Sequence, residues 1–187
     1  MKKIALMMTG VLATALLLAA CAAPSAQTEP TPTPTEQASE ATEESADGAL
    51  EFSITTLTGE TLDQTVFSDH KLIMVNYWAT WCGPCVSEIP DLVQISNDYA
   101  DKGFALVGVL SGDDDIEGAQ QFIADQGMTY PVVLPEDIFL DYTNGMYAIP
   151  TTLFFDSTGK QVGNTVVGAK SYEDWTGLID LLLEQVS

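Results

Sequence analysis

The stretch Trp81-Cys82-Gly83-Pro84-Cys85 decides how the rest of the chain is interpreted. The residues before it, Leu72–Trp78, form an apolar, β-rich run that predicts a buried parallel strand. The residues after it, 86–99, show the spacing of a helix. Two cysteines separated by two residues can close a small disulfide ring and open it again. The sequence therefore predicts a redox-active pair where a strand ends and a helix begins.

The two cysteines have different expected roles. Cys82 lies at a helix N-terminus, where free N–H groups and the helix dipole stabilise a thiolate, so we expect it to be the attacking thiol. Cys85, one turn further, is then the resolving thiol. Gly83 and Pro84 complete the ring, and proline is tolerated in a first helical turn because its missing N–H costs nothing there. A static disulfide is the alternative, which we disfavour because a ring exposed at a helix start is strained and easily reduced.

A Cys-x-x-Cys pair also occurs in zinc sites. This chain has no second pair of cysteines at such a spacing, and its only histidine is His70. A four-ligand zinc site therefore cannot be assembled from these residues, and we predict no metal. We expect His70 to be a surface turn residue, and the Cys82–Cys85 disulfide to be the redox centre without any added cofactor.

The segment 75–90, Val-Asn-Tyr-Trp-Ala-Thr-Trp-Cys-Gly-Pro-Cys-Val-Ser-Glu-Ile-Pro, resembles the membrane-anchored, extracytoplasmic TlpA/ResA-like branch of the thioredoxin superfamily. A second resemblance lies at 148–152, Ala-Ile-Pro-Thr-Thr. The resemblance to this branch covers roughly residues 50–187. It implies an α/β thioredoxin-like three-layer sandwich with a central mixed sheet, an N-terminal β-hairpin and an inserted helix–strand unit. It also implies that Pro150 is cis and faces the dithiol.

The hydrophobic periodicity predicts the following elements. Strands are expected at 50–57, 61–62, 72–78, 104–110, 130–134, 152–155 and 162–167. Helices are expected at 82–100, kinked at Pro90, and at 116–126, 138–144 and 172–185. The run Asp113-Asp114-Asp115 is interpreted as the negative start of the second helix rather than as a weak cation site.

Three further residues are expected to support the dithiol. Trp81 would shield it and pack beside it, and the alternative is that it is only a core or surface aromatic residue. Ile149 would offer backbone groups for short β-type pairing with an extended client segment. Pro150 would shape the surface that receives this segment.

Glu88 is the third candidate catalytic residue, because the resemblance implies that a glutamate three residues after Cys85 manages protons at the dithiol. Cytoplasmic thioredoxins use a buried aspartate on the central strand for this purpose. The matching residue here is Asn76, which cannot titrate. The base would then be Glu88, water or no group at all, and the alternative for Glu88 is a solvated helix glutamate without a function.

Composition excludes some functions. The formal net charge is −21, with six lysines and no arginine, which is the wrong sign for nucleic-acid binding. Anionic headgroups would also repel the domain from a membrane surface. The lack of arginine argues against a thiol peroxidase, because in that family an arginine holds the thiolate.

The amino terminus resembles a bacterial lipoprotein signal. Residues 1–20 have a short basic start followed by an apolar run, as in a secretory signal peptide. Leu18-Ala19-Ala20-Cys21 resembles a lipobox, which implies cleavage before Cys21 and a diacylglycerol anchor on its sulfur. An uncleaved transmembrane helix and a stray redox thiol are the alternatives. Residues 21–49 are an acidic, Thr/Pro/Ser-rich stretch that we expect to be a disordered linker, leaving 50–187 as the folded domain.

These observations favour a protein-disulfide reductase that acts outside the cytoplasm. We expect it to be a monomer that is attached to the membrane by its lipid anchor. The resemblance implies electrons from a membrane thiol donor of the CcdA/DsbD type, and clients such as apocytochrome c. A disulfide-forming oxidase or isomerase and a non-catalytic, redox-sensing adaptor are the alternatives.

Overall fold

The computed structural model describes residues 51–187, and the predicted signal, Cys21 and linker lie outside the described residues. A five-stranded mixed sheet has the order β5-β4-β3-β6-β7. Its strands are β3 (Leu72–Trp78), β4 (Phe104–Leu110), β5 (Val132–Val133), β6 (Thr151–Asp156) and β7 (Gln161–Val167). β4 runs parallel to β3 and β5, whereas β6 is antiparallel to β3 and β7.

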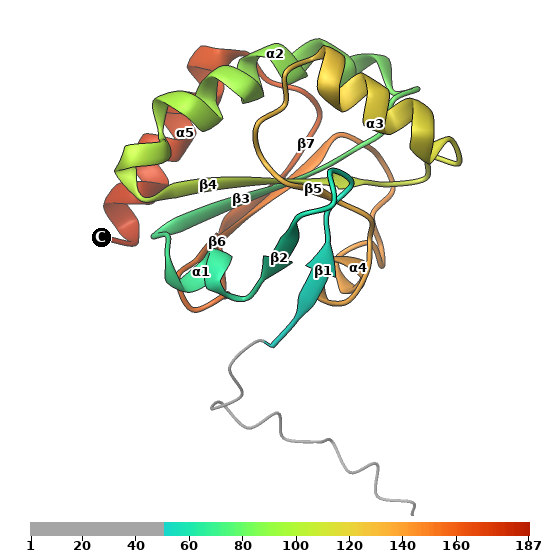
Figure 1. Ribbon diagram of the computed structural model, residues 1–187. Coiled ribbons are helices and arrows are strands. Elements are labelled where there is room, and N and C mark those ends of the chain that lie inside the picture. Colours follow the sequence, from blue (N-terminus) through green and yellow to red (C-terminus); the bar gives the residue numbers. More distant parts are fainter. Residues whose placement is uncertain (1–50) are drawn as a thin grey trace, which may run out of the picture. The chain divides into compact units, whose positions relative to one another are not determined.

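Two layers cover the sheet (Figure 1). One face carries the helices α2 (Gly83–Asp98), α3 (Ile116–Asp125) and α5 (Tyr172–Gln185). The other carries the hairpin β1 (Ser53–Thr55) and β2 (Thr61–Asp63), with the short helices α1 (Thr65–Ser68) and α4 (Ile138–Asp141). A 3-10 turn, η1 (Ala100–Lys102), precedes β4. The predicted thioredoxin-like three-layer fold is confirmed.

The central strand β3 belongs to both cores, since every one of its residues is buried. Alternate side chains point to opposite faces of a sheet. Leu72, Met74 and Trp78 therefore pack beneath α2, α3 and α5. Ile73, Val75 and Tyr77 pack beneath the hairpin, α1 and α4. A strand buried on both sides is a rigid support for the residues at its end.

Helix α2 is the element that carries the dithiol. Its N-cap is Cys82, whose sulfur accepts the Cys85 backbone N–H at 3.3 Å. Pro90 lies inside α2. After η1 the chain turns into β4 through Gly103, whose φ of +79° is readily adopted only without a side chain. Helix α5 packs beside α2, where its Asp180 accepts the Tyr99 hydroxyl at 2.8 Å.

Several expected boundaries are wrong. Residues 50–57 contain a strand of only three residues, and residues 130–134 one of only two. The helix expected at 138–144 ends at Asp141, and α1 was not predicted. Within residues 51–187, no helix is both long and apolar enough to cross a membrane.

Candidate active site

The dithiol lies at the carboxyl end of β3 and the amino end of α2. Cys82 and Cys85 form a disulfide with a Cα–Cα distance of 5.2 Å. Cys82 is only 5% exposed and Cys85 is fully buried. The expectation of an exposed ring is therefore wrong, because α2 turns the second cysteine into the core and leaves one sulfur near the surface. A partner can reach only Cys82, as an attacking thiol requires.

The segment before β6 faces the dithiol. The Ile149–Pro150 peptide bond is cis, as the resemblance implied. The Ile149 carbonyl oxygen lies 3.7 Å from Cys82 Sγ. Pro150 itself is buried, and its carbonyl accepts the Gly168 N–H at 2.8 Å. The peptide beside the reactive sulfur is thus fixed by the sheet that follows it.

Trp81 is 65% exposed, so it does not pack into the core. Its indole N–H donates to the Gly112 carbonyl at 2.8 Å, which ties the residue before Cys82 to the loop after β4. The aromatic face is fixed in place but open to solvent. Trp81 is therefore an exposed aromatic residue and not a core aromatic, and its shielding of the dithiol stays a prediction.

Replacing Trp81 by Ala should weaken the reaction with protein clients without destabilising the fold. An exposed side chain contributes little to stability, so we expect the free energy of unfolding to change by less than about 1 kcal/mol. Loss of an aromatic contact with a client should lower kcat/KM for protein disulfides by about tenfold, which corresponds to about 1.4 kcal/mol. Stopped-flow reduction of a disulfide-bonded protein tests this, with Trp81→Phe as the matched control. An equal loss in both variants would contradict the role of the indole.

Asp113 lies in the same loop after β4 and ties it to Thr80, the residue before Trp81. Its Oδ2 accepts the Thr80 N–H at 2.9 Å and the Thr80 hydroxyl at 2.5 Å. Burial opposes ionisation of Asp113, but the hydrogen bonds from Thr80 outweigh it and lower the pKa of this carboxyl. Asp115 caps α3 by accepting the Gly118 N–H at 2.9 Å, as predicted for a helix start. The role of Asp113 as an anchor of the pre-cysteine turn was not predicted.

Glu88 is 2% exposed. It lies with Cys85 on the buried side of α2, so the solvated-glutamate alternative is wrong. Its Oε1 accepts Asn76 Nδ2 at 3.1 Å. Its Oε2 accepts the Lys170 backbone N–H at 3.1 Å and Trp175 Nε1 at 3.2 Å. Desolvation raises the pKa of Glu88 above its ordinary value, although the three hydrogen bonds oppose the shift.

Asn76 extends this network to β6. Its Nδ2 also donates to Thr152 Oγ1 at 3.0 Å, and Thr152 is fully buried. The sequence indicated that Asn76 cannot titrate, but the bond to Glu88 and the contributions of Lys170 and Trp175 were not predicted. The helical face that contains Trp175 predicted its burial, whereas nothing in the periodicity indicated a partner for its N–H.

His70 takes no part in the site. It precedes β3, whereas Cys82 follows that strand, so about 20 Å of extended chain separates them. Its Nδ1 lies 2.9 Å from the Val66 carbonyl oxygen, in the turn after α1. Within residues 51–187, no three His, Cys, Asp or Glu side chains are grouped as a metal site would need.

The arrangement can perform thiol-disulfide exchange. One sulfur is reachable at a helix N-terminus, the second is buried one turn away, and a buried carboxyl with a raised pKa lies on the same helix face. The Redoxin family model matches residues 40–174. This range contains Cys82, Cys85 and Glu88, whereas Trp175, which donates to Glu88, lies one residue beyond it. The chain belongs to the Redoxin family.

Curated relatives agree with this Redoxin assignment. The chain is 30% identical to the thioredoxin-like protein YneN of Bacillus subtilis (strain 168) over 135 residues, 71% of this chain and 77% of the relative. It is 27% identical to the thiol-disulfide oxidoreductase ResA of Bacillus anthracis over 131 residues, 70% of this chain and 74% of the relative. It is similar in structure to a thiol:disulfide interchange protein of the thioredoxin family from Chlorobium tepidum TLS, with a TM-score of 0.64 and 31% identity over 72% of this chain and 94% of that one. This Redoxin protein is a ResA-like thiol-disulfide oxidoreductase.

Proposed function

We propose that this oxidoreductase works as a reductase of client protein disulfides outside the cytoplasm, anchored through a lipid on Cys21. The observation that carries the proposal is the asymmetry of the dithiol, in which Cys82 at a helix N-terminus keeps 5% of its surface exposed beside Ile149 and Cys85 is fully buried. The Gly83-Pro84 pair between the cysteines, like that of reducing thioredoxins, supports the reducing direction. The lipobox-like sequence ending at Cys21 supports the location.

The exchange proceeds in two steps. The Cys82 thiolate attacks one sulfur of a client disulfide, which forms a mixed disulfide and releases the client's other sulfur as a thiolate. Cys85 then loses its proton and attacks Cys82 Sγ. This forms the Cys82–Cys85 disulfide and releases the second client thiolate. The client gains two electrons and, once both thiolates are protonated, two protons.

Glu88 is the proposed proton acceptor for Cys85 in the second step. A general base works best when its pKa is near the operating pH, and burial raises the pKa of Glu88 in that direction. Asn76, the Lys170 N–H and Trp175 are positioning groups for this carboxyl. The resulting disulfide is reduced again by a membrane thiol donor of the CcdA/DsbD type, so no further cofactor is required.

The reduction potential of the Cys82–Cys85 pair tests the direction of electron flow. The full-length chain, in a non-ionic detergent, is equilibrated against dithiothreitol couples, and alkylation of the peptide containing both cysteines is measured by mass spectrometry so that Cys21 does not contribute. We expect a value near that of thioredoxin, about −270 mV. A value near about −120 mV would instead identify a disulfide-forming oxidase. A reducing potential without turnover of disulfide-bonded insulin would identify a redox-sensing adaptor.

A further inference from the structure

A hollow lies beside the dithiol, since its lining includes Trp81, which precedes Cys82 in the chain, and Ile149, whose carbonyl oxygen lies 3.7 Å from Cys82 Sγ. It is lined on one side by Trp81 and Gly112 and on the other by Met146, Tyr147 and Ile149, and its volume is about 260 Å³. Small-molecule sites usually measure about 300–1,000 Å³, so this hollow is better suited to one or two side chains of a peptide. Because Ile149 is shared by the hollow and the contact with Cys82, a side chain placed here belongs to a residue next to the attacked cysteine.

We call this hollow the client groove, and exposed aromatic residues form its rims. Tyr147 is 85% exposed, and it also borders a second hollow, of about 170 Å³, that leads to Val167 on β7. Trp81 on the opposite rim is fixed by its bond to Gly112. Tyrosine and tryptophan bring large contact areas at low entropic cost, and methionine adapts to different apolar shapes. The groove is thus suited to an apolar client side chain.

The charged residues nearest in sequence to the groove have one sign. The stretch 111–149 supplies every lining residue except Trp81, and it contains eight acidic residues and no lysine, arginine or histidine. Asp114 and Asp141, both exposed, lie close in sequence to the lining residues Gly112 and Thr143. Neither carboxylate has a hydrogen-bond partner among the described residues.

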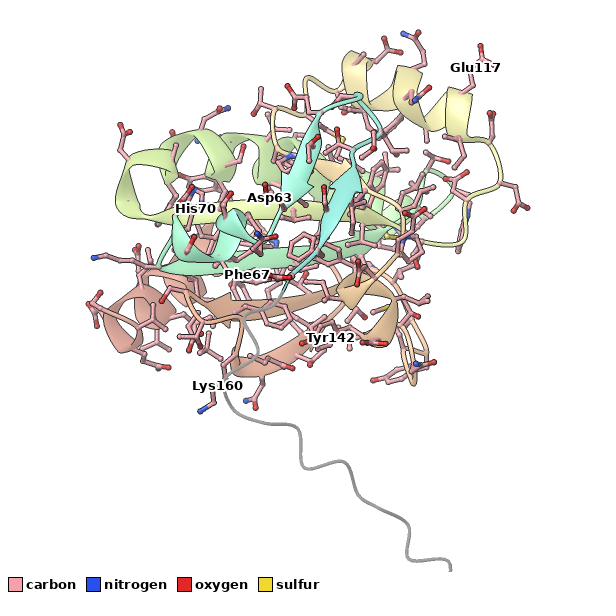
Figure 2. All side chains as sticks on the ribbon, turned by 60° about the horizontal axis from the view of Figure 1, so that its bottom comes forward. Asp63, Phe67, His70, Glu117, Tyr142 and Lys160 are labelled. Carbon is pink, nitrogen blue, oxygen red and sulfur yellow. A yellow bond between two sulfur atoms is a disulfide. The ribbon has the colours of Figure 1, made fainter. Side chains whose placement is uncertain are left out.

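Three of the four lysines of the described domain lie at the other end of the sheet. Lys71 and Lys102 come just before β3 and β4 begin. Lys160 lies in the turn after Asp156, which pairs with Leu72 at the first residue of β3. Figure 2 shows Lys160 and the acidic Glu117 of α3 on opposite sides of the domain. The fourth, Lys170, lies beside α5, with its Nζ 6.0 Å from the centroid of the Trp175 ring.

We infer that the preferred client segment is cationic, with an apolar residue next to its disulfide cysteine and lysine or arginine beside it. The inference rests on the proposed function and specifies the substrate class of the same site. The apolar side chain fills the client groove between Trp81 and Tyr147. The basic residues meet the negative field of Asp114 and Asp141, which raises the rate of encounter and weakens as salt is added.

Two synthetic peptides test the inference. Each is closed by one disulfide and has leucine before its first cysteine, and they differ only in a flanking lysine pair or glutamate pair. The reduced full-length chain in a non-ionic detergent is mixed with each peptide, and the second-order rate is measured. At about 0.02 M ionic strength we expect the lysine peptide to react about tenfold faster, and at about 0.5 M we expect the difference to fall below about twofold.

Matched variants locate the effect. Asp114→Asn with Asp141→Asn should reduce the preference for the lysine peptide by about threefold, whereas Asp69→Asn with Asp101→Asn, the same charge change at the opposite end, should leave it unchanged. Tyr147→Ser should slow the leucine peptides but not versions with serine in place of leucine. Equal rates for both peptides, or equal effects of the two double variants, would overturn the inference. Failure to reduce any peptide would instead overturn the proposed function.

Discussion

Replacing Cys82 by Ser is expected to abolish reduction of client disulfides, with a loss of at least about 10³-fold in turnover. A serine hydroxyl stays protonated at neutral pH and is a poor nucleophile towards sulfur. The fold should survive, because serine also caps helices well and its oxygen can accept the Cys85 N–H that the sulfur accepts now. Insulin reduction measures the activity, and circular dichroism with urea unfolding confirms that the variant is folded.

Cys85→Ser is the matched control, because it should stop the reaction one step later. Cys82 can still attack, but no second thiol resolves the product, so the chain should accumulate as a mixed disulfide with its client. Non-reducing gels and mass spectrometry detect this adduct, which should be absent in the Cys82→Ser variant. Adducts that form in Cys82→Ser instead would mean that Cys85 is the attacking thiol, against its complete burial.

Glu88→Ala is expected to lower the free energy of unfolding by about 3–5 kcal/mol. The substitution leaves three buried donors without an acceptor, namely Asn76 Nδ2, the Lys170 N–H and Trp175 Nε1. It also removes side-chain volume between α2 and α5. Urea unfolding at neutral pH measures the loss. A change below about 1 kcal/mol would show that the network contributes little, as for an exposed side chain.

Glu88→Gln is the conservative control, because most of the network can be kept. The glutamine oxygen can accept from Lys170 and Trp175, and its amide can donate to Asn76 if the Asn76 amide turns over and Thr152 becomes a donor. We expect a loss of less than about 2 kcal/mol from this rearrangement. Activity that falls in this folded variant, together with a changed pH–rate profile, would support Glu88 as the proton acceptor. An unchanged profile would contradict it.

Comparison of the wild type with Glu88→Gln gives a pH dependence of the free energy of unfolding whose sign can be predicted. Because burial raises the pKa of Glu88 in the folded state, the folded chain binds a proton more tightly than the unfolded chain. Stability contributed by the protonated form is complete below the unfolded pKa, about 4.3, and is lost as the pH rises through the raised pKa of the folded state. The wild type should therefore lose stability relative to Glu88→Gln across this window. A difference that stays constant with pH would show that the Glu88 pKa is not raised.

Elements with a strong and continuous pattern could be predicted to the residue. The bounds of β3, β4 and α5 agree with the expected ranges, because long apolar runs and a periodic helix face determine them. The dithiol, the cis Pro150 and the burial of Trp175 were expected on the same grounds or by resemblance. Short elements were not predicted well: four-residue α1 and two-residue β5 are too short to show any periodicity.

The surroundings of Glu88 could not be predicted for a different reason. Its partners Lys170 and Trp175 follow it by 82 and 87 residues, and Asn76 precedes it by 12 residues, on β3. No local pattern encodes which side chains meet across a sheet and two helices. The contact of Asp113 with Thr80, 33 residues apart, was missed for the same reason. Such contacts depend on the three-dimensional arrangement of the elements, which only the structure shows.

The sheet order has a consequence for how the molecule is assembled as it is synthesised. The cysteines occur early in the domain, but β6, which pairs with one edge of β3, begins at Thr151, and two donors to Glu88 come later still. A nascent chain that ends before Ile149 has its cysteines but lacks both β6 and the Ile149 carbonyl that faces Cys82. The surroundings of the dithiol and of Glu88 are therefore complete only once residues 149–187 have been added.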